Sequence, residues 1–297
     1  MLRRFTAGLP IDLSASLRAI AAGWGDTAVR IGTEGAWLAT RSPDGPATVR
    51  FTGDGASLQA EAWGPGAPWL LEHAPDTIGA GDDLTGFTPS HPLVRRLHRR
   101  YPGLRVTRTA RVFEAALRIV TAQRVSGIEA RRGYAAMARA LGEPAPGPGG
   151  LLLPPDPGRL ASTAYHRFHP LGIERERAVR IIRVARAAGR LEEAAAMEPG
   201  AAQRRLTAVQ GIGPWTAAKV AFVALGDPDA VPVGDFNTPN IVAWALAGEP
   251  RGDDARMLEL LEPFRGHRGR VIALLKAAGI TAPAYGPRSP LRSIERM

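Results

Sequence analysis

The chemistry that this chain can perform is concentrated around a glycine-rich segment. Gly211-Ile-Gly213 separates two stretches of helical character at 201–209 and 214–225. Two glycines around one apolar residue let the backbone N–H groups of such a hairpin approach a phosphate with no side chain in the way. The pattern predicts a clamp for a DNA backbone. The alternative is a packing turn between two helices, in which glycine serves a steric purpose only.

Asp235 lies downstream of this hairpin and is the acidic residue best suited to catalysis. A carboxylate beside a sugar can stabilise the positive charge that develops when a glycosidic bond breaks, or can orient the attacking water. The structural alternative is a helix cap, which is a common role for Asp. Thr238 and Pro239 weaken it, because Thr238 is a ready cap and a helix capped by Asp235 would place Pro239 where its N–H is needed.

Composition and charge narrow the function classes. The 297 residues, 45% of them hydrophobic, are enough to bury a core in about two or three compact units. A formal charge of +10 implies an anionic partner, with nucleic acid the leading candidate and a merely solvated arginine-rich surface the alternative. Arginines crowd residues 95–111 and 265–270, which favours phosphate contacts. Because the chain has no cysteine, it cannot hold an iron–sulfur cluster or a thiolate zinc site.

The sequence shows no feature that directs the chain to a membrane. No apolar stretch approaches the roughly eighteen residues of a membrane span, and no signal peptide is visible at residues 2–5. We therefore expect a cytoplasmic, nucleoid-associated protein that works as a monomer and does not contact a membrane.

Hydrophobic periodicity divides the chain into two parts, a small α/β domain with an antiparallel sheet at 1–87 and a helical domain at 88–297. Strands are expected at 36–39, 47–52 and 57–63, with a helix at 13–22 capped by Asp12. Helices are expected at 91–100, 111–124, 128–141, 174–188, 201–209, 214–225, 239–247, 254–262 and 267–278. Residues 142–157 are rich in proline and glycine and are expected to form a long loop. The fold class is mostly α.

Four segments, taken together, resemble the helix-hairpin-helix DNA glycosylase superfamily, and most closely its DNA-3-methyladenine glycosylase II family. They are residues 116–126, 171–178, 206–217 and 231–236. The resemblance extends over roughly residues 88–280. It implies a fold of two helical subdomains with a DNA-binding cleft between them, catalysis by Asp235, and no required cofactor.

The resemblance also assigns residues to the pocket for the damaged base. Bifunctional members of the superfamily carry a nucleophilic lysine where this chain has Trp215, so a monofunctional enzyme is implied. Trp215 and Phe236 take the places of pocket aromatics, with a core aromatic as the alternative for each. Lys219 replaces another pocket aromatic, and Lys276 stands where a tryptophan would be expected. These departures make the pocket more cationic, which should repel a cationic lesion.

Contacts to DNA are implied at two further places. Gln123 and Arg124 match the residues that fill the gap left by the extruded base, although Arg124 could instead contact a phosphate. The phosphate-facing N–H groups would be those of Gly211, Gly213 and Thr216.

A monovalent ion is implied at the hairpin. In the family, backbone carbonyls hold a sodium or potassium ion that bridges to a DNA phosphate. By position these carbonyls belong to Thr207, Val209 and Ile212. The ion is expected only when DNA is bound.

These inferences together predict a monofunctional DNA glycosylase. It would bind double-stranded DNA, flip out damaged and in particular alkylated purines, and cleave their N-glycosidic bonds in base excision repair, leaving an abasic site. Two alternatives stay open. One is a bifunctional oxidised-purine glycosylase and lyase that uses Lys219, and the other is a damage-sensing DNA-binding protein without turnover.

Overall fold

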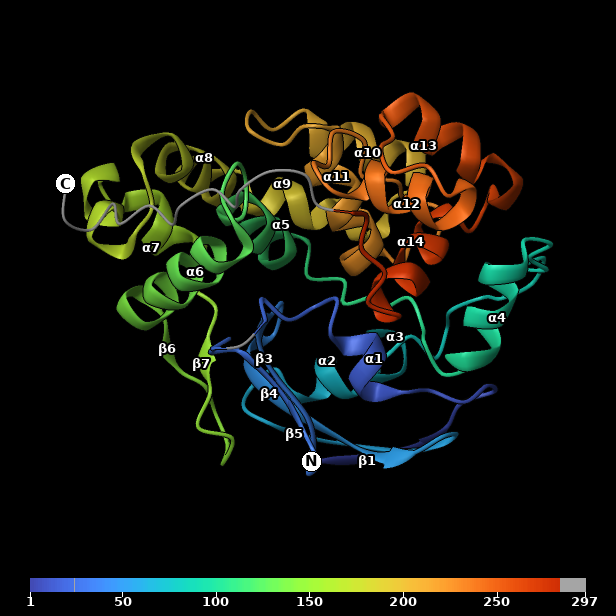
Figure 1. Cartoon of the computed structure of the whole chain (residues 1–297). Coiled ribbons are helices and arrows are strands. Elements are labelled where there is room, and N and C mark those ends of the chain that lie inside the picture. The colour runs from blue at the N-terminus through green and yellow to red at the C-terminus, as the bar shows by residue number, and fades with distance from the viewer. Residues whose placement is uncertain (24, 284–297) are drawn as a thin grey trace.

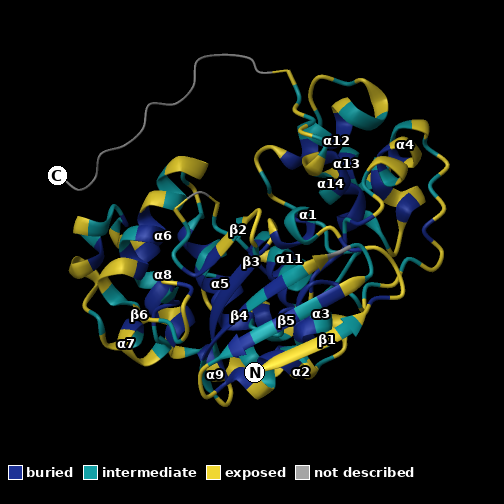
Figure 2. Cartoon of the chain, turned by 90° about the horizontal axis from the view of Figure 1, so that it is seen from below, coloured by how far each residue is buried: buried dark blue, intermediate teal, exposed yellow. Residues whose placement is uncertain are grey.

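A five-stranded antiparallel sheet lies along one side of the molecule, below the helices in the view of Figure 1. The computed structural model describes residues 1–23 and 25–283. In the order β1-β5-β4-β3-β2, the sheet contains β1 (Leu2–Thr6), β2 (Val29–Gly32), β3 (Gly35–Ser42), β4 (Gly45–Asp54) and β5 (Ser57–Trp63). Strands β2 to β5 follow one another through tight turns, and β1 adds to the exposed edge of β5, as Figure 2 shows.

Successive side chains along a strand point to opposite faces of the sheet, and the two faces pack against different parts of the molecule. In β5, Leu58 and Ala60 point into a core shared with helices α1 (Leu13–Leu17) and α2 (Ala67–Glu72). On the opposite face Trp37 stacks on Trp63 with ring centroids 5.4 Å apart. That stack is part of a smaller cluster built against the short hairpin of β6 (Glu143–Pro144) and β7 (Leu152–Leu153). The central strands are therefore buried on both sides.

The remaining elements are helical. They are α3 (Ala74–Thr77), α4 (Pro92–Arg100), α5 (Val112–Thr121), α6 (Gly127–Leu141), α7 (Pro157–Ser162), α8 (Arg175–Arg186), α9 (Ala188–Glu192), α10 (Pro199–Thr207), α11 (Pro214–Val220), α12 (Thr238–Ala247), α13 (Asp254–Leu261) and α14 (Arg268–Ala277). Short 3-10 segments lie at η1 (Tyr165–Leu171), η2 (Glu193–Ala196) and η4 (Glu262–Phe264), and a π-helical turn, η3 (Ala221–Leu225), extends α11. None of the helices in the described part of the chain has the length and apolar character needed to cross a membrane.

The helices bury two separate hydrophobic cores, which correspond to two helical subdomains. One core is built by α5, α6, α8, α10 and α11 around residues such as Leu117 and Ile181. The other is built by α4, α12, α13 and α14 around residues such as Val242 and Val271. In Figure 1 these groups lie side by side above the sheet. Helix α4 packs on α14, although the two are far apart in the sequence. The second subdomain is therefore completed by segments from distant parts of the chain.

Two buried polar contacts fasten the sheet domain to the helices. Arg270 of α14 makes a bidentate ion pair with Asp82, with both N–O distances at 2.6 Å and both side chains at most 3% exposed. Glu114 of α5 accepts hydrogen bonds from the Thr40 hydroxyl and the Arg41 backbone N–H, at 2.8 and 2.9 Å. Removing one partner of a buried ion pair costs roughly 3–5 kcal/mol, so the Asp82–Arg270 pair fixes the position of α14 firmly.

The mostly helical fold with a small antiparallel sheet domain is confirmed. Each helix predicted from residue 91 onward is present within a few residues of its predicted ends. The prediction for 13–22 was too long, because α1 ends at Leu17 and the chain then turns toward the helical part. The edge strands β1 and β2 and the short helices α2, α3, α7 and α9 were missed, since so few residues carry too little periodicity. The segment 142–157, expected to be a loop, contains the short paired strands β6 and β7.

Candidate active site

The predicted hairpin is present between α10 and α11. Helix α10 ends at Thr207 and α11 begins at Pro214, with Gly213 as its N-cap in an extended conformation. Gly211 has a φ of +105°, a conformation that favours glycine, and a Cβ there would lie 3.1 Å from Cγ of Arg180. Gly213 is exposed, and a Cβ on it would meet no atom within 4 Å. Gly213 therefore leaves open the end of α11, where the first N–H groups have no partner inside the helix.

Gln123, just beyond the end of α5, holds this hairpin in place. Its amide nitrogen donates to the carbonyl of Gly211 at 2.9 Å and to the hydroxyl of Thr216 at 2.8 Å. Its amide oxygen accepts from Arg180 at 3.4 Å. The Thr216 side chain is buried, so it contributes to this bracing contact, while its N–H lies in the first turn of α11. The structure thus brings Gln123, Gly211 and Thr216 together, with the Gln123 amide engaged by the hairpin.

Arg124 follows Gln123 in an unusual backbone conformation. Its φ of +58° is left-handed, which costs a non-glycine residue of order 1–3 kcal/mol. The side chain is 79% exposed, and its nearest acidic atom is Oε2 of Glu176, at 4.0 Å. Because Gln123 is bound to the hairpin, Arg124 projects from the protein surface beside it.

The predicted ion-binding carbonyls lie at the end of α10 and in the hairpin loop. Thr207 is the last residue of α10, and the carbonyl of Val209 accepts the N–H of Ile212 at 2.9 Å. A carbonyl oxygen has two lone pairs, so this bond leaves Val209 able to accept a further ligand. Among the described residues, His, Cys, Asp and Glu side chains do not gather into a group that could hold a metal ion.

Asp235 is held by three hydrogen bonds on both carboxylate oxygens. Its Oδ2 accepts the indole N–H of Trp215 at 2.7 Å, and its Oδ1 accepts the backbone N–H groups of Asn237 and Thr238 at 3.0 and 2.9 Å. Burial alone would raise the pKa of this carboxyl. The hydrogen bonds, led by that of Trp215, and the charges of two nearby lysines together lower the pKa to about 2. Asp235 is therefore ionised at neutral pH.

The same contacts show that the structural and the chemical expectations for Asp235 do not exclude each other. Helix α12 begins at Thr238 with Asn237 as its N-cap, and no side-chain bond comes from Asn237 itself. Asp235 supplies that acceptor for the first N–H groups of the helix. The expected cap, Thr238, is inside the helix and its buried hydroxyl has no hydrogen-bond partner. One oxygen of Asp235 supports the helix, and the other faces Trp215.

Two lysines stand close to Asp235. The ammonium of Lys219 lies over the ring of Trp215, 4.6 Å from its centroid. Burial lowers the pKa of Lys219, and the charge of Asp235 opposes that shift. Burial also lowers the pKa of Lys276, and repulsion from Lys219 adds to it, although part of the Lys276 side chain is exposed to solvent. The charges of Lys219, Lys276 and Asp235 are therefore close enough to act on one another.

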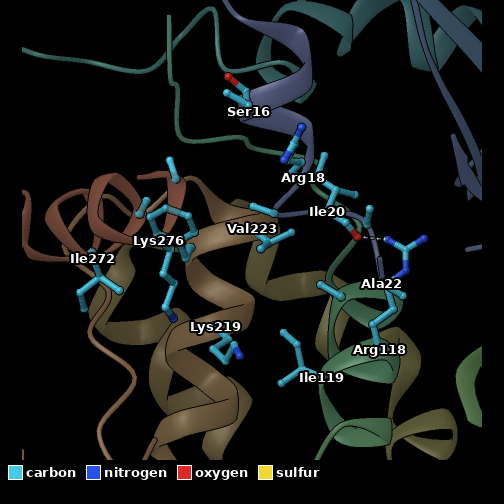
Figure 3. A pocket seen from close by; sticks show the side chains of 18 of the residues that line it. Ser16, Arg18, Ile20, Ala22, Arg118, Ile119, Lys219, Val223, Ile272 and Lys276 are labelled. Carbon is cyan, nitrogen blue, oxygen red and sulfur yellow. Dashed lines mark hydrogen bonds between the residues drawn. The ribbon is translucent and has the colours of Figure 1, made fainter. Parts of the chain in front are cut away.

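A cavity of about 760 Å³ adjoins this group of charges. It lies between α1 and the segment after it, α5, α6, α11 and α14, and Figure 3 shows Lys219 and Lys276 on one of its walls. Trp215 and Asp235 do not line it themselves, but Lys219, which does, stands over the Trp215 ring, and that ring is hydrogen-bonded to Asp235. Phe236 also does not line it, and its side chain is 88% exposed. Of the four predicted pocket and catalytic residues, the structure groups Trp215, Lys219 and Asp235 and leaves Phe236 at the surface.

The opposite wall of the cavity contains residues that the sequence analysis did not single out. Arg118 of α5 donates to the carbonyl of Ile20 at 2.7 Å and to the hydroxyl of Tyr134 at 3.1 Å. Burial raises the pKa of Tyr134 to about 12, against the influence of Arg118. Arg18, which follows α1, also lines the cavity. The sheet domain therefore forms part of the cavity wall, and no local motif in residues 13–22 signals this.

Comparison with known proteins is partial at the level of sequence. No family model matches the chain. Over 155 residues it is 32% identical to the probable bifunctional transcriptional activator/DNA repair enzyme AlkA of two Mycobacterium tuberculosis strains. This match covers 49% of the chain and 29% of the relative, so the chain spans less than a third of the length of the curated relatives it matches.

Similarity of fold extends over nearly the whole chain. A 3-methyladenine DNA glycosylase from Archaeoglobus fulgidus aligns with a TM-score of 0.76 at 18% identity, covering 92% of this chain and 97% of that one. The Clostridium acetobutylicum 8-oxoguanine glycosylase/lyase, in complex with double-stranded DNA, aligns with a TM-score of 0.70 at 13% identity, covering 94% and 97%. The chain therefore shares the fold of DNA glycosylases of known structure, and about half of it is similar in sequence to a probable DNA repair enzyme.

Proposed function

We propose that this protein is a monofunctional DNA glycosylase that excises damaged purines, alkylated purines among them, and leaves an abasic site. The relative from Mycobacterium tuberculosis is described as a DNA repair enzyme, and the Archaeoglobus fulgidus structure as a 3-methyladenine glycosylase. Both descriptions support this activity. The bound DNA of the Clostridium acetobutylicum structure supports double-stranded DNA as the partner.

The observation that carries the proposal is the ionised carboxylate of Asp235 downstream of an open hairpin. When the bond between C1′ and the base nitrogen breaks, positive charge develops on the deoxyribose, and an ionised carboxylate stabilises it. The base leaves with the electron pair of the broken bond, and water forms the new bond to C1′. The proton that this water loses passes to the departing base or to solvent. The hairpin N–H groups at Gly213 hold the adjacent phosphate and so position the sugar.

A second candidate function is favoured by one observation. Bifunctional glycosylases attack the sugar with an amine, and an amine attacks only when it has lost its proton. Burial lowers the pKa of Lys219 against the opposing charge of Asp235, so its ammonium loses a proton more readily than that of an exposed lysine. Lys219 is one helical turn beyond Trp215, the position that the nucleophile takes in the family. The monofunctional mechanism is nevertheless favoured, because the amine of Lys219 lies over the Trp215 ring and the position of the family nucleophile is occupied by Trp215 itself.

The test is release of free base from a panel of duplexes, each with one defined lesion, by the wild type and by Asp235→Asn. Base release that requires Asp235 supports the glycosylase. Binding of the same duplexes without release of any base would contradict it and support the damage-sensing alternative. Strand cleavage without added base or heat would support the lyase.

We propose a boundary between sheet domain and helical domain near Phe87, a monomeric state, and action in the cytoplasm on nucleoid DNA. We also propose that a sodium or potassium ion binds the hairpin carbonyls of Thr207, Val209 and Ile212 when DNA is present, and that the reaction needs no other cofactor. Size-exclusion chromatography with light scattering tests the monomeric state directly.

A further inference from the structure

We propose that Lys219 and Lys276 make this enzyme selective for damaged purines that carry no positive charge. The favoured class is an uncharged purine with oxygen or nitrogen acceptors that can face the two ammonium groups. The disfavoured class is a purine alkylated on a ring nitrogen so that its nucleotide is a cation. This inference rests on the proposed glycosylase function and concerns the substrate of that same site.

The charges of the cavity wall are almost all positive. Its charged lining in the described part of the chain consists of the cationic residues Arg18, Arg105, Arg118, Arg131, Lys219 and Lys276 and the single carboxylate of Asp12. Asp12 caps helix α1 by accepting the N–H of Ala15 at 2.9 Å, so its charge is directed to the helix end. Outside the lining, Asp82 acts on the charge of Arg105, and Asp26 and Glu114 act on that of Arg118. The positive charge that matters for a base in this cavity is therefore that of Lys219 and Lys276.

Asp235 does not offset this positive charge. One carboxylate stands against two ammonium groups whose charges act on it, and Asp235 is not among the residues that line the cavity. Its oxygens are already engaged by the Trp215 indole and by the backbone at the start of α12. Burial, and after it repulsion from Lys219, lower the pKa of Lys276, while the charge of Asp235 opposes both. Two ammonium groups thus stand against one carboxylate.

The ring of Trp215 does not restore affinity for a cation. The negative face of an indole attracts cations, which would suit a positively charged base. Here the ammonium of Lys219 already stands over that ring, 4.6 Å from its centroid. The cation that this aromatic ring can attract is therefore supplied by the protein. A cationic base would have to displace Lys219 or share the ring with it.

An uncharged purine meets the opposite situation. Ammonium groups have three N–H donors and no acceptor, so they pair with carbonyl oxygens and ring nitrogens. Two unit charges a few ångströms apart at a partly buried site change binding by one to two orders of magnitude. Excluding a cation and pairing with an acceptor act in the same direction, and both depend on the same two lysines.

The experiment compares three duplexes of the same sequence with a single 1,N6-ethenoadenine, hypoxanthine or 7-methylguanine. The first two lesions are uncharged and the third is a cation. Single-turnover base release is expressed as acceleration over spontaneous loss, because the cationic nucleotide is intrinsically labile. We expect at least one uncharged lesion to be accelerated about tenfold or more beyond 7-methylguanine.

Two double variants assign the preference to the lysines. Lys219→Met with Lys276→Met removes both charges at similar length, and should shift the ratio of acceleration toward 7-methylguanine by about tenfold or more. Lys219→Arg with Lys276→Arg keeps both charges and should keep the preference. Thermal melting checks that each variant is folded, and single substitutions replace any double variant that is not.

Three outcomes would overturn the inference. One is greatest acceleration of 7-methylguanine by the wild type, and another is an unchanged ratio in folded methionine variants. The third is an equal loss of affinity for damaged and undamaged DNA in those variants, which would make the lysines phosphate contacts. If the wild type releases none of the bases, the glycosylase proposal itself is wrong, and the relative affinities for the three duplexes still measure the charge preference.

Discussion

The indole N–H of Trp215 donates a 2.7 Å hydrogen bond to Oδ2 of Asp235, and so links the first turn of α11 to the loop before α12. Trp215 comes directly from the hairpin that is predicted to hold DNA, whereas Asp235 is the predicted catalytic carboxylate. The bond fixes the carboxylate relative to the predicted phosphate clamp. It also contributes to the low pKa that keeps Asp235 charged.

Asp235→Asn removes the negative charge and keeps the shape of the side chain. Base release should fall by at least about a hundredfold, which is typical for loss of one electrostatic stabiliser in a transition state. Affinity for DNA should stay similar or rise, because a carboxylate repels phosphates. Single-turnover assays and equilibrium binding measure the two effects. Undiminished turnover in the variant would end the catalytic assignment.

Trp215→Phe removes the indole donor and should raise the pKa of Asp235 from about 2 toward its ordinary value of 3.8. In the folded wild type the pKa of Asp235 lies below its ordinary value, so the carboxylate charge that stabilises the transition state is fully present above pH 3.8 and is lost only as the pH falls toward 2. The wild-type rate should therefore stay flat at mildly acidic pH, whereas the variant should lose activity at a higher pH. Because the two pKa values lie between about 2 and 3.8, rates of folded protein measured from pH 3 to 8 decide this, and identical acid limbs would count against the hydrogen bond.

Gly213→Ala tests the predicted phosphate contact of the hairpin without introducing backbone strain. The backbone of Gly213 is extended and a Cβ there meets nothing within 4 Å, so the variant should fold with an unchanged Tm. Affinity for damaged and undamaged DNA should fall alike, and the salt dependence should decrease by about one phosphate contact. Gly211→Ala is the matched control, because its φ of +105° should lower the Tm as well. Normal DNA binding by Gly213→Ala would make the hairpin a packing turn.

Arg124→Gly tests the residue at the end of α5 without harming the fold. Glycine adopts a φ of +58° readily, so the Tm should be unchanged or higher. If Arg124 fills the gap left by an extruded base, excision should fall while affinity for undamaged DNA is kept. If it contacts a phosphate, affinity for all DNA should fall equally. Unchanged excision and unchanged affinity together would remove Arg124 from the DNA interface.

Lys219→Ala tests the monofunctional mechanism. We expect the wild type to form no covalent adduct with damaged DNA in the presence of borohydride and to cleave no strand without added base or heat. The variant should keep base-release chemistry and change its preference among lesions. An adduct that forms with the wild type and disappears in Lys219→Ala would instead establish the lyase, consistent with the lowered pKa of Lys219.

The sequence alone determined the helical architecture and the hairpin. Helices such as α5 and α8 have long amphipathic repeats, so each could be recognised from its own residues. The hairpin was equally visible, because glycines at fixed spacing followed by Pro214 form a local signal. Asp235 was located by its family motif, and its possible roles in capping and in chemistry were both visible beforehand.

Only the tertiary structure decided the environment of that carboxylate. Trp215, Lys219, Asp235 and Lys276 come from three segments, and no local pattern states that two ammonium groups and one carboxylate are close together. The contribution of the sheet domain to the cavity, the bracing role of Gln123 and the exposure of Phe236 also depend on packing between distant segments. Electrostatic and packing interactions depend on distance in space, whereas the sequence gives directly only distance along the chain.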